Sequence, residues 1–318
     1  MIKILANDGI DPIGKEMLEK AGFQVDTQNI PQEELALRLD EYDAVTVRSA
    51  TKIRRELIDA CPNLKLIGRG GVGMDNIDVE HARMKGITVV NTPASSSLSV
   101  AELVFAHLFG GVRFLYDANR QLPLQGATNF AGLKKKYAKG SELHGKTLGI
   151  LGFGRIGREV AKLAFGAGMD VIAYDLYEFS PEVELHLAND TRVSMRVKTA
   201  SKEELLRNSD FVTVHVPAQS GGLPALGKAE FDMMKDGAAL VNCARGGVLD
   251  EEALIAALDS GKLSFAGLDV FDGEPTPSQK ILSHPKISLS PHIGAATGEA
   301  QERIGVELAN LIIDFFKK

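Results

Sequence analysis

Short apolar runs alternate with segments of helical periodicity along the first hundred residues. The apolar runs span six or seven residues and are rich in Val, Ile and Leu, as in "DAVTVRS" (43–49). Between them, apolar positions recur every three to four residues, as in "DPIGKEMLEKAG" (11–22). Strands separated by helices of about ten residues predict βαβ units and a parallel sheet. The expected strands are 1–7, 23–28, 43–49, 64–69 and 87–92, and the expected helices are 11–22, 31–42, 54–62 and 79–86.

A long amphipathic segment, residues 97–122, follows this first α/β region. It is too long and too central for an ordinary crossover, so we expect one helix that bridges two domains. The basic stretch "GLKKKYAKG" (132–140) is expected to be a loop. The alternation of strands and helices then resumes at residue 145, and a last helical segment closes the chain.

The pattern therefore predicts an α/β protein with two Rossmann-like domains, each built on a parallel sheet. We expect one domain to combine residues 1–97 with 292–318 and the other to span 98–291. The site is expected in the cleft between the two domains.

Two glycine-rich loops carry the pattern G-x-G-x-x-G, which is typical of dinucleotide-binding folds. The first is "GRGGVG" (68–73) and the second is "GFGRIG" (152–157). With 32 glycines in 318 residues, the pattern alone is weak evidence. A true nucleotide loop also opens a helix that receives the phosphates, and a carboxylate ends the next strand about 20 residues on.

These surroundings favour the second loop. A helical segment with apolar positions 160, 163, 164 and 167 follows it, and Asp175 ends the next apolar run, 23 positions after Gly152. The same step from Gly68 reaches Asn91, which has no charge, and "MDNID" after the first loop is poor in helix formers. We therefore expect the second loop to bind a dinucleotide, against the alternative of a structural turn. The Asp175 carboxylate would repel a 2′-phosphate, which favours NAD over NADP.

Composition narrows the class of protein further. Hydrophobic residues make up 44% and charged residues 25% of the chain, which is typical of a soluble globular protein. The net charge of −6 gives no reason to expect a nucleic-acid partner. The two cysteines, Cys61 and Cys243, have no paired spacing, so we expect neither a disulfide framework nor a metal site. No apolar run reaches signal-peptide or membrane-spanning length, so we expect a cytoplasmic protein without membrane contact.

Three residues that could carry chemistry follow predicted strands of the second half: Arg245, Glu274 and His292. Parallel α/β sheets place their sites at these carboxyl ends. An Arg can fork onto a carboxylate, and a Glu bonded to a His would hold its tautomer for proton transfer. Each residue alone could equally be a capping Arg, a solvated Glu or a loop His. Their joint position in a nucleotide-binding domain favours catalysis.

Several strings together resemble the D-isomer-specific 2-hydroxyacid dehydrogenase family: "GRGGVGMDNID", "GKTLGILGFGRIGREVA", "VNCARGGVLDEEAL", "AGLDVFDGEP" and "PHIGAAT". The resemblance covers nearly the whole chain and implies a flavodoxin-like substrate domain and an NAD-binding Rossmann domain. It implies that His292 takes the hydroxyl proton as hydride leaves, that Glu274 tunes His292, and that Arg245 anchors the substrate. The implied cofactor pocket comprises Gly152, Gly154, Arg155, Ile156, Gly157, Asp175, His215, Val216, Pro217, Cys243, Ala244, Asp269 and Ala295.

The resemblance also turns the first glycine loop into a substrate loop. The backbone N–H groups of Gly71, Val72 and Gly73 would receive the substrate carboxylate, as a nest of amides can. "VRSATKI" and "VVNTPASSSLSVAEL" fit those family members that act on 3-phospho-D-glycerate.

Basic residues could bind the phosphate of such a substrate. Arg48, beside Ser49, and Arg69 are the candidates in the first half. Lys135 matches a basic residue that these members present from the neighbouring subunit, although Lys134 and Lys136 are equally suitable by charge. The alternative for all of them is ordinary solvated surface charge.

The expected activity is NAD-dependent oxidation of 3-phospho-D-glycerate to 3-phosphohydroxypyruvate, the entry to serine synthesis, by a homodimer. One alternative is a reductase of glyoxylate, hydroxypyruvate or another 2-keto acid, in which residues 134–136 play no part. Another is an NAD(H)-sensing binding protein on the same scaffold, like the family's transcriptional corepressors. Because the chain ends with the family's last helix, no C-terminal regulatory domain is expected.

Overall fold

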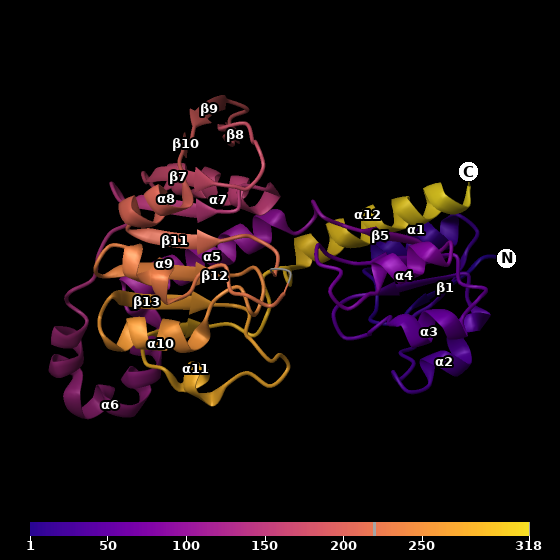
Figure 1. Ribbon diagram of the computed structural model, residues 1–318, viewed down its shortest axis with the longest axis horizontal. Helices are drawn as coiled ribbons and strands as arrows, with labels where there is room; N and C mark the ends of the chain where they lie inside the picture. Colours follow the sequence, from indigo (N-terminus) through magenta and orange to yellow (C-terminus); the bar gives the residue numbers. More distant parts are fainter. Residues whose placement is uncertain (219–220, 318) are drawn as a thin grey trace. The chain divides into compact units, whose positions relative to one another are not determined.

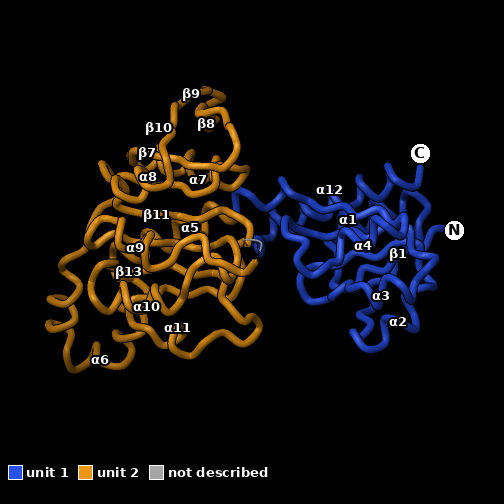
Figure 2. Tube along the Cα trace, in the orientation of Figure 1, with its two compact units in different colours: residues 1–99, 295–318 blue, residues 100–294 orange. Residues whose placement is uncertain are grey.

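The computed structural model describes residues 1–218 and 221–317, which form two compact units (Figure 2). Unit 1 comprises Met1–Ser99 and Ala295–Lys318, and unit 2 comprises Val100–Gly294. These boundaries lie two and three residues from the ones expected from the sequence. As a consequence, His292 belongs to unit 2 and not to the C-terminal segment with which it was grouped.

Unit 1 has a parallel sheet of five strands in the order β2-β1-β3-β4-β5. This is the flavodoxin-like order, in which the strand sequence reverses between the first and third strands. The strands are β1 (Lys3–Ala6), β2 (Gln24–Asp26), β3 (Ala44–Val47), β4 (Leu66–Arg69) and β5 (Thr88–Asn91). The helices are α1 (Pro12–Lys20), α2 (Leu35–Arg38), α3 (Arg55–Ala60), α4 (Val79–Met84) and α12 (Gly298–Phe316), with a 3-10 turn at Leu39–Glu41. Figure 1 labels two of the strands, β1 and β5, and the helices α1 to α4 and α12 of the same unit.

Helices α1 and α12 cover one face of this sheet. Leu18 of α1 and Leu308 of α12 pack in one apolar cluster with Ile4 of β1. A Cβ on Gly14 would lie 2.6 Å from the carbonyl oxygen of Gly305, so these glycines let the two helices touch. The C-terminal helix is thereby tied to the N-terminal sheet.

Unit 2 has a parallel sheet of seven strands in the order β10-β7-β6-β11-β12-β13-β14. Counted within the unit, this is 3-2-1-4-5-6-7, the order of a dinucleotide-binding Rossmann sheet with one added strand. The strands are β6 (Thr147–Leu151), β7 (Asp170–Tyr174), β10 (Lys198–Thr199), β11 (Phe211–Val214), β12 (Ala238–Asn242), β13 (Leu263–Leu268) and β14 (Ile287–Leu289). The helices are α5 (Ser97–Val112), which begins in unit 1, α6 (Leu115–Lys136), α7 (Arg155–Gly166), α8 (Lys202–Asn208), α9 (Lys228–Met233), α10 (Glu251–Asp259) and α11 (Gln279–Ser283).

Two apolar clusters fill the faces of the second sheet. Val104 of α5 and Val160 of α7 pack with Ile150 in one cluster, and Leu206 of α8 and Leu254 of α10 belong to the other. Both sheets are therefore α/β layers with helices on both faces, and the predicted fold class is confirmed.

Two local predictions were wrong, and one element was not predicted. The expected bridging helix is two helices, because Phe114 adopts a left-handed conformation with φ +56° between α5 and α6. Residues 132–136 of the basic stretch expected as a loop belong to the end of α6, where Lys side chains complement the helix dipole, and residues 137–140 lie beyond the helix. The segment between β7 and β10 forms an antiparallel hairpin, β8 (Glu182–His186) and β9 (Arg192–Arg196), which the sequence reading missed.

Membrane-spanning potential is confined to one pair of helices. Among the described residues, no single helix is long and apolar enough to cross a membrane. Helices α5 and α6 meet that criterion only together, and they are bent by 55° at the break between them.

Candidate active site

The second glycine loop connects β6 to α7. Each of its three glycines suits its position for a different structural reason. Gly152 has φ +94°, and a Cβ there would lie 2.5 Å from the carbonyl oxygen of His215. A Cβ on Gly157 would lie 2.4 Å from the carbonyl oxygen of Gly152, so this glycine lets the helix pack against the loop. At Gly154, by contrast, a Cβ would meet nothing within 4 Å. The middle glycine therefore leaves open space where a phosphate can approach the backbone.

Helix α7 starts at this open position. Its N-cap residue, Gly154, has no side chain to cap the first amides, which follow at Arg155 and Ile156. The first N–H groups of a helix have no partner inside the helix, and they favour an anion. The open loop and the uncapped helix of 12 residues together fit the pyrophosphate of a dinucleotide.

Asp175 follows β7 beside this loop. Its Oδ2 accepts a hydrogen bond of 2.7 Å from the Phe153 N–H, and its Oδ1 accepts one of 3.1 Å from the Tyr177 N–H. A carboxylate offers about four acceptor positions, so about two remain for ribose hydroxyls. The geometry fits the predicted ribose contact.

We expect the Asp175→Asn variant to bind NAD about tenfold more weakly and to lose about tenfold of its preference for NAD over NADP. Charged hydrogen bonds contribute about 1.5–3 kcal/mol, and the repulsion of a 2′-phosphate disappears with the charge. Titration of both cofactors into both proteins measures the two ratios. An unchanged preference would contradict the role of Asp175.

The other residues of the predicted cofactor pocket lie in both units. Burial lowers the pKa of His215 to about 3, so its ring is neutral, and Nε2 lies 2.9 Å from Thr213 Oγ1. Its Nδ1 is buried without a hydrogen-bond partner among the described residues. Cys243 and Ala244 are buried after β12, and burial raises the pKa of the Cys243 thiol well above its usual range. Val216 packs against the apolar cluster that contains Leu206 and Leu254. Pro217 is exposed, and Ala295 belongs to unit 1.

Three adjacent strands, β12, β13 and β14, carry the candidate catalytic residues beyond their carboxyl ends. His292 Nδ1 lies 2.7 Å from Glu274 Oε2, while Glu274 Oε1 accepts a 2.9 Å hydrogen bond from the Phe271 N–H. Because the carboxylate can only accept, Nδ1 carries a proton, and in the neutral ring Nε2 therefore has the lone pair. His292 Nε2 makes no hydrogen bond within the described residues, and the His292 side chain is 46% exposed. The pair can therefore accept a proton from a bound hydroxyl.

Arg245 follows β12 at the start of a glycine pair. Its Nη1 donates a 2.6 Å hydrogen bond to the Ala244 carbonyl. The Arg245 carbonyl accepts a 2.9 Å hydrogen bond from Asn242 Nδ2. A Cβ on Gly246 would lie 1.9 Å from the Phe271 carbonyl oxygen, so the backbone after Arg245 runs close to the segment that leads to Glu274. The same loops thus bring the Arg and Glu segments together.

The candidate substrate loop lies in unit 1 and is only partly open. The Gly71 N–H donates a 2.7 Å hydrogen bond to Thr92 Oγ1, so this amide is already used. The Val72 carbonyl accepts a 2.7 Å hydrogen bond from Asn91 Nδ2, and Val72 is 37% exposed. Of the three amides predicted to bind a carboxylate, those of Val72 and Gly73 are the remaining donors.

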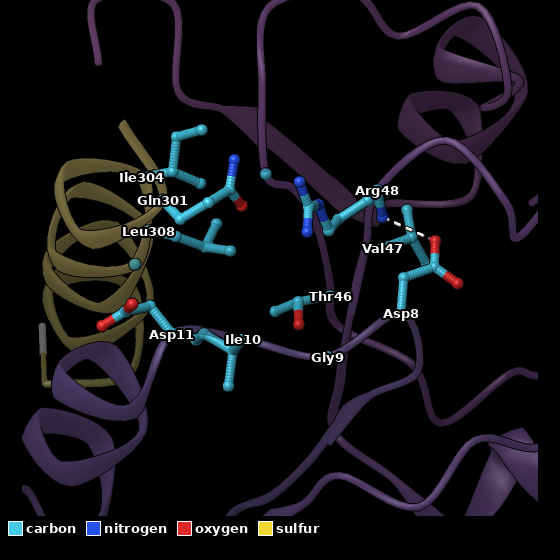
Figure 3. Close-up of a pocket in the computed structure, with 12 residues that line it drawn as sticks. Asp8, Gly9, Ile10, Asp11, Thr46, Val47, Arg48, Gln301, Ile304 and Leu308 are labelled. Carbon is cyan, nitrogen blue, oxygen red and sulfur yellow. Dashed lines mark hydrogen bonds between the residues drawn. The ribbon is translucent and has the colours of Figure 1, made fainter. Parts of the chain in front are cut away.

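Arg48 lines a pocket of about 230 Å³ within unit 1 (Figure 3). The pocket lies beyond the carboxyl ends of β1 and β3, where the strand order reverses, which is the usual ligand position in this type of sheet. The backbone N–H of Arg48 donates a 2.7 Å hydrogen bond to Asp8 Oδ2, which is drawn in Figure 3. This hydrogen bond fixes the backbone at Arg48. Thr46 is 1% exposed, and its hydroxyl has no hydrogen-bond partner in the described residues.

Sequence reasoning missed Asp8 and Thr46 in this pocket. Asp8 lies just beyond β1, and Thr46 is the last residue but one of β3. A position near the carboxyl end of a predicted strand, the signal that identified His292, could therefore have identified both. Ser49, also predicted for this site, is exposed, and Arg69 Nη1 donates 2.7 Å to the Gly70 carbonyl.

The three lysines of α6 differ in their surroundings. Lys136 Nζ lies 2.6 Å from Asp117 Oδ2, and this hydrogen bond raises the pKa of Lys136. Lys134 and Lys135 are exposed and have no ion pair in the part of the chain that the structure describes. Lys136 is the least available of the three for an added phosphate.

Among the described residues, no group of three or more His, Cys, Asp or Glu side chains is arranged to hold a metal ion. Cys61 and Cys243 are both buried and free.

Comparison with known proteins decides the family. Residues 105–294 match the family model described as D-isomer specific 2-hydroxyacid dehydrogenase, NAD binding domain. The chain belongs to this family. The matched residues include the second glycine loop and exclude the first, so the predicted family and the NAD-binding domain are confirmed.

Individual relatives carry the names of different enzymes. The chain is 41% identical to D-3-phosphoglycerate dehydrogenase of Sus scrofa over 99% of its own length and 56% of that protein. It is 42% identical to hydroxypyruvate reductase of Thermotoga maritima over 95% of each chain. A glyoxylate reductase structure from Paecilomyes thermophila superposes with a TM-score of 0.85 at 30% identity, covering 100% of this chain and 96% of that one. The chain thus spans little more than half the length of the D-3-phosphoglycerate dehydrogenases that it matches.

Proposed function

We propose that the protein oxidises 3-phospho-D-glycerate to 3-phosphohydroxypyruvate with NAD. The hydrogen bond of 2.7 Å between His292 and Glu274, in the same unit as the NAD-binding loop, is the observation that carries the proposal. Similarity to D-3-phosphoglycerate dehydrogenase over 99% of the chain supports the choice of acid. We further propose that the reaction takes place in the cytoplasm as the first step of serine synthesis.

The chain's own residues divide the chemistry between them. His292 Nε2 takes the hydroxyl proton while the hydride leaves the same carbon, so the alcohol becomes a ketone. Glu274 holds the ring in the required tautomer and stabilises the imidazolium that forms. Arg245 binds the substrate's carboxylate or the developing carbonyl oxygen with its fixed fork of donors. When bound, NAD supplies the hydride acceptor.

Unit 1 is proposed to hold the acid. The Val72 and Gly73 amides would receive the carboxylate, and Arg48 would meet the phosphate. Support comes from the Arg48 pocket at the strand-order reversal and from its buried Thr46 hydroxyl, which has no hydrogen-bond partner in the described part of the chain. Lys135 is proposed to contribute from a second subunit.

A homodimer is proposed because α5 and α6 expose several large apolar side chains. Clusters of such residues on a soluble protein mark interaction surfaces, and identical subunits pair through the same patch. The exposed residues are Phe109, Leu115, Leu122, Leu124 and Phe130.

We expect the Leu124→Asp variant to shift the protein from dimer to monomer in sedimentation velocity, because a charge would replace an apolar contact. Leu124 is 77% exposed, so the substitution should leave the fold of unit 2 intact. Leu37, 82% exposed on α2, gives the matched control, and Leu37→Asp should leave the dimer unchanged. If both variants had the same oligomeric state, α6 would not be part of the dimer interface.

Steady-state assays of NAD reduction with 3-phospho-D-glycerate, D-glycerate and D-lactate test the proposed reaction. We expect kcat/KM to be highest for the phosphorylated acid. Preference for an unphosphorylated acid would support the 2-keto acid reductase alternative, for which the Thermotoga maritima relative, matched over 95% of each chain, is the supporting observation. Turnover of none of them, with intact NAD binding, would support the NAD(H)-sensing alternative.

A further inference from the structure

A chain of buried polar groups lies beneath the His292 segment, entirely within unit 2. His107 on α5 is 4% exposed, and its Nδ1 and Nε2 lie 2.9 and 3.0 Å from the hydroxyls of Ser288 and Ser290. Ser290 Oγ donates a 2.6 Å hydrogen bond to Asp269 Oδ1.

The direction of every hydrogen bond in this chain can be assigned. A carboxylate only accepts, so the single hydroxyl proton of Ser290 goes to Asp269, and His107 Nε2 must donate to Ser290. Burial lowers the pKa of His107, so the ring is neutral and has one N–H. Its Nδ1 therefore accepts the proton of Ser288. Donation runs in one direction, from Ser288 through His107 and Ser290 to Asp269.

Asp269 connects this chain to the backbone that follows His292. Its Oδ1 and Oδ2 each accept 2.8 Å hydrogen bonds, from the Ile293 and Gly294 N–H groups. His292 itself has φ +54°, a left-handed conformation that costs a non-glycine residue free energy and persists only where the surroundings enforce it. The Asp269 carboxylate is the group that pins the two amides beyond this strained residue.

The position of His107 is also shaped by its neighbour on β13. A Cβ on Gly267 would lie 2.6 Å from His107 Cβ, so only glycine lets α5 approach the strand here. An aliphatic residue at position 107 would fill this space but leave the Ser288 hydroxyl without its acceptor and the Ser290 oxygen without its donor. Unpaired buried polar groups cost about 1–3 kcal/mol. The site is therefore built for a side chain that both donates and accepts.

We propose that His107 is a positioning residue for the catalytic histidine. Through Ser290 and Asp269 it holds the segment 292–294 in place, so that His292 Nε2 keeps its alignment with the substrate hydroxyl. The inference rests on the proposed function, since it assigns His107 a part in orienting the same base.

The test compares His107→Leu, which breaks both hydrogen bonds, with His107→Gln, whose amide can donate to Ser290 and accept from Ser288. We expect His107→Leu to lower kcat about 10- to 100-fold with a smaller change in KM, because misplaced catalytic groups lose rate rather than binding. The Gln variant should recover most of kcat. Ser290→Ala breaks the same link without altering the helix, and it serves if the Leu variant folds poorly.

Ser209→Ala is the matched control. Ser209 is fully buried, and its hydroxyl donates a 2.7 Å hydrogen bond to the Leu205 carbonyl. Both residues are far in sequence from the polar groups that link His107 to Asp269. This substitution should cost similar stability and leave kcat within about twofold. Equal kcat in the Leu, Ser290→Ala and control variants would overturn the proposal.

Hydrogen exchange at the Ile293 and Gly294 amides provides a readout that needs no turnover. We expect faster exchange at both amides in His107→Leu and Ser290→Ala, and unchanged exchange in Ser209→Ala. Unchanged exchange in the first two variants would overturn the positioning role. A wild type without turnover contradicts the proposed function alone, because the exchange experiment still decides the role of His107.

Discussion

Replacing His292 with asparagine is expected to lower kcat for the hydroxy acid by about 10²- to 10⁴-fold, the usual contribution of a positioned general base. Asparagine cannot take the hydroxyl proton, while the NAD-binding loop lies on other elements of the unit. The dissociation constant for NAD should therefore stay within about twofold of the wild-type value. Steady-state kinetics and NAD titration of the same preparations measure both quantities.

A second histidine–carboxylate pair provides the control. His284 Nε2 lies 3.3 Å from Asp259 Oδ1 in the same unit, and the His284 side chain is 7% exposed. His284→Asn removes an equivalent pair outside the site, so kcat should remain within about twofold. If His292→Asn retained more than about a tenth of wild-type kcat, His292 could not be the base.

The Gly152→Ala variant is expected to lose both stability and NAD binding. The left-handed φ of +94° is strained for alanine, and the new Cβ would lie 2.5 Å from the His215 carbonyl oxygen. Strain of this kind costs about 1–3 kcal/mol, so the thermal unfolding midpoint should fall by about 2–4 °C for each kcal/mol. Differential scanning calorimetry measures the loss.

Gly154→Ala separates the two effects. A Cβ at this position meets nothing within 4 Å, so the protein without cofactor should be as stable as the wild type. Equal destabilisation by the two variants would mean that the space at Gly154 is not open as described.

The division into two α/β units could be predicted because it depends on local periodicity. Residues 43–49 and 64–69 read as strands from a few neighbouring positions, and the structure places β3 and β4 within them. The carboxylate Asp175 was found by its fixed spacing from Gly152, which reflects the length of one βαβ unit. Patterns that repeat along the chain can be recognised without knowledge of tertiary contacts.

The features that were missed depend on contacts between distant segments. The break at Phe114 and the helical end of α6 could not be inferred from apolar spacing, and the Lys136–Asp117 bond joins positions 19 residues apart. The polar chain from His107 to Asp269 needs α5, β13 and β14 to be assembled. A buried histidine reads as ordinary core until its two serine partners are known.

The candidate functional residues show the same division. Arg245, Glu274 and His292 could be named because each follows a predicted strand, but only the structure brings His292 Nδ1 to 2.7 Å from Glu274. Thr46 could have been found by the same rule, because it lies near the end of "DAVTV". The use of the Gly71 amide by Thr92 has no counterpart in the sequence pattern.

We propose that the second glycine loop binds NAD while the first binds the acid. Titration of NAD into wild type, Gly154→Ala and Gly70→Ala tests this claim most directly. A Cβ on Gly70 would come no closer than 3.2 Å to the Ile304 side chain, so that variant should fold. We predict a dissociation constant raised about tenfold or more by Gly154→Ala, which is about 1.4 kcal/mol, and changed less than about twofold by Gly70→Ala. Weaker NAD binding in Gly70→Ala with normal binding in Gly154→Ala would contradict the account.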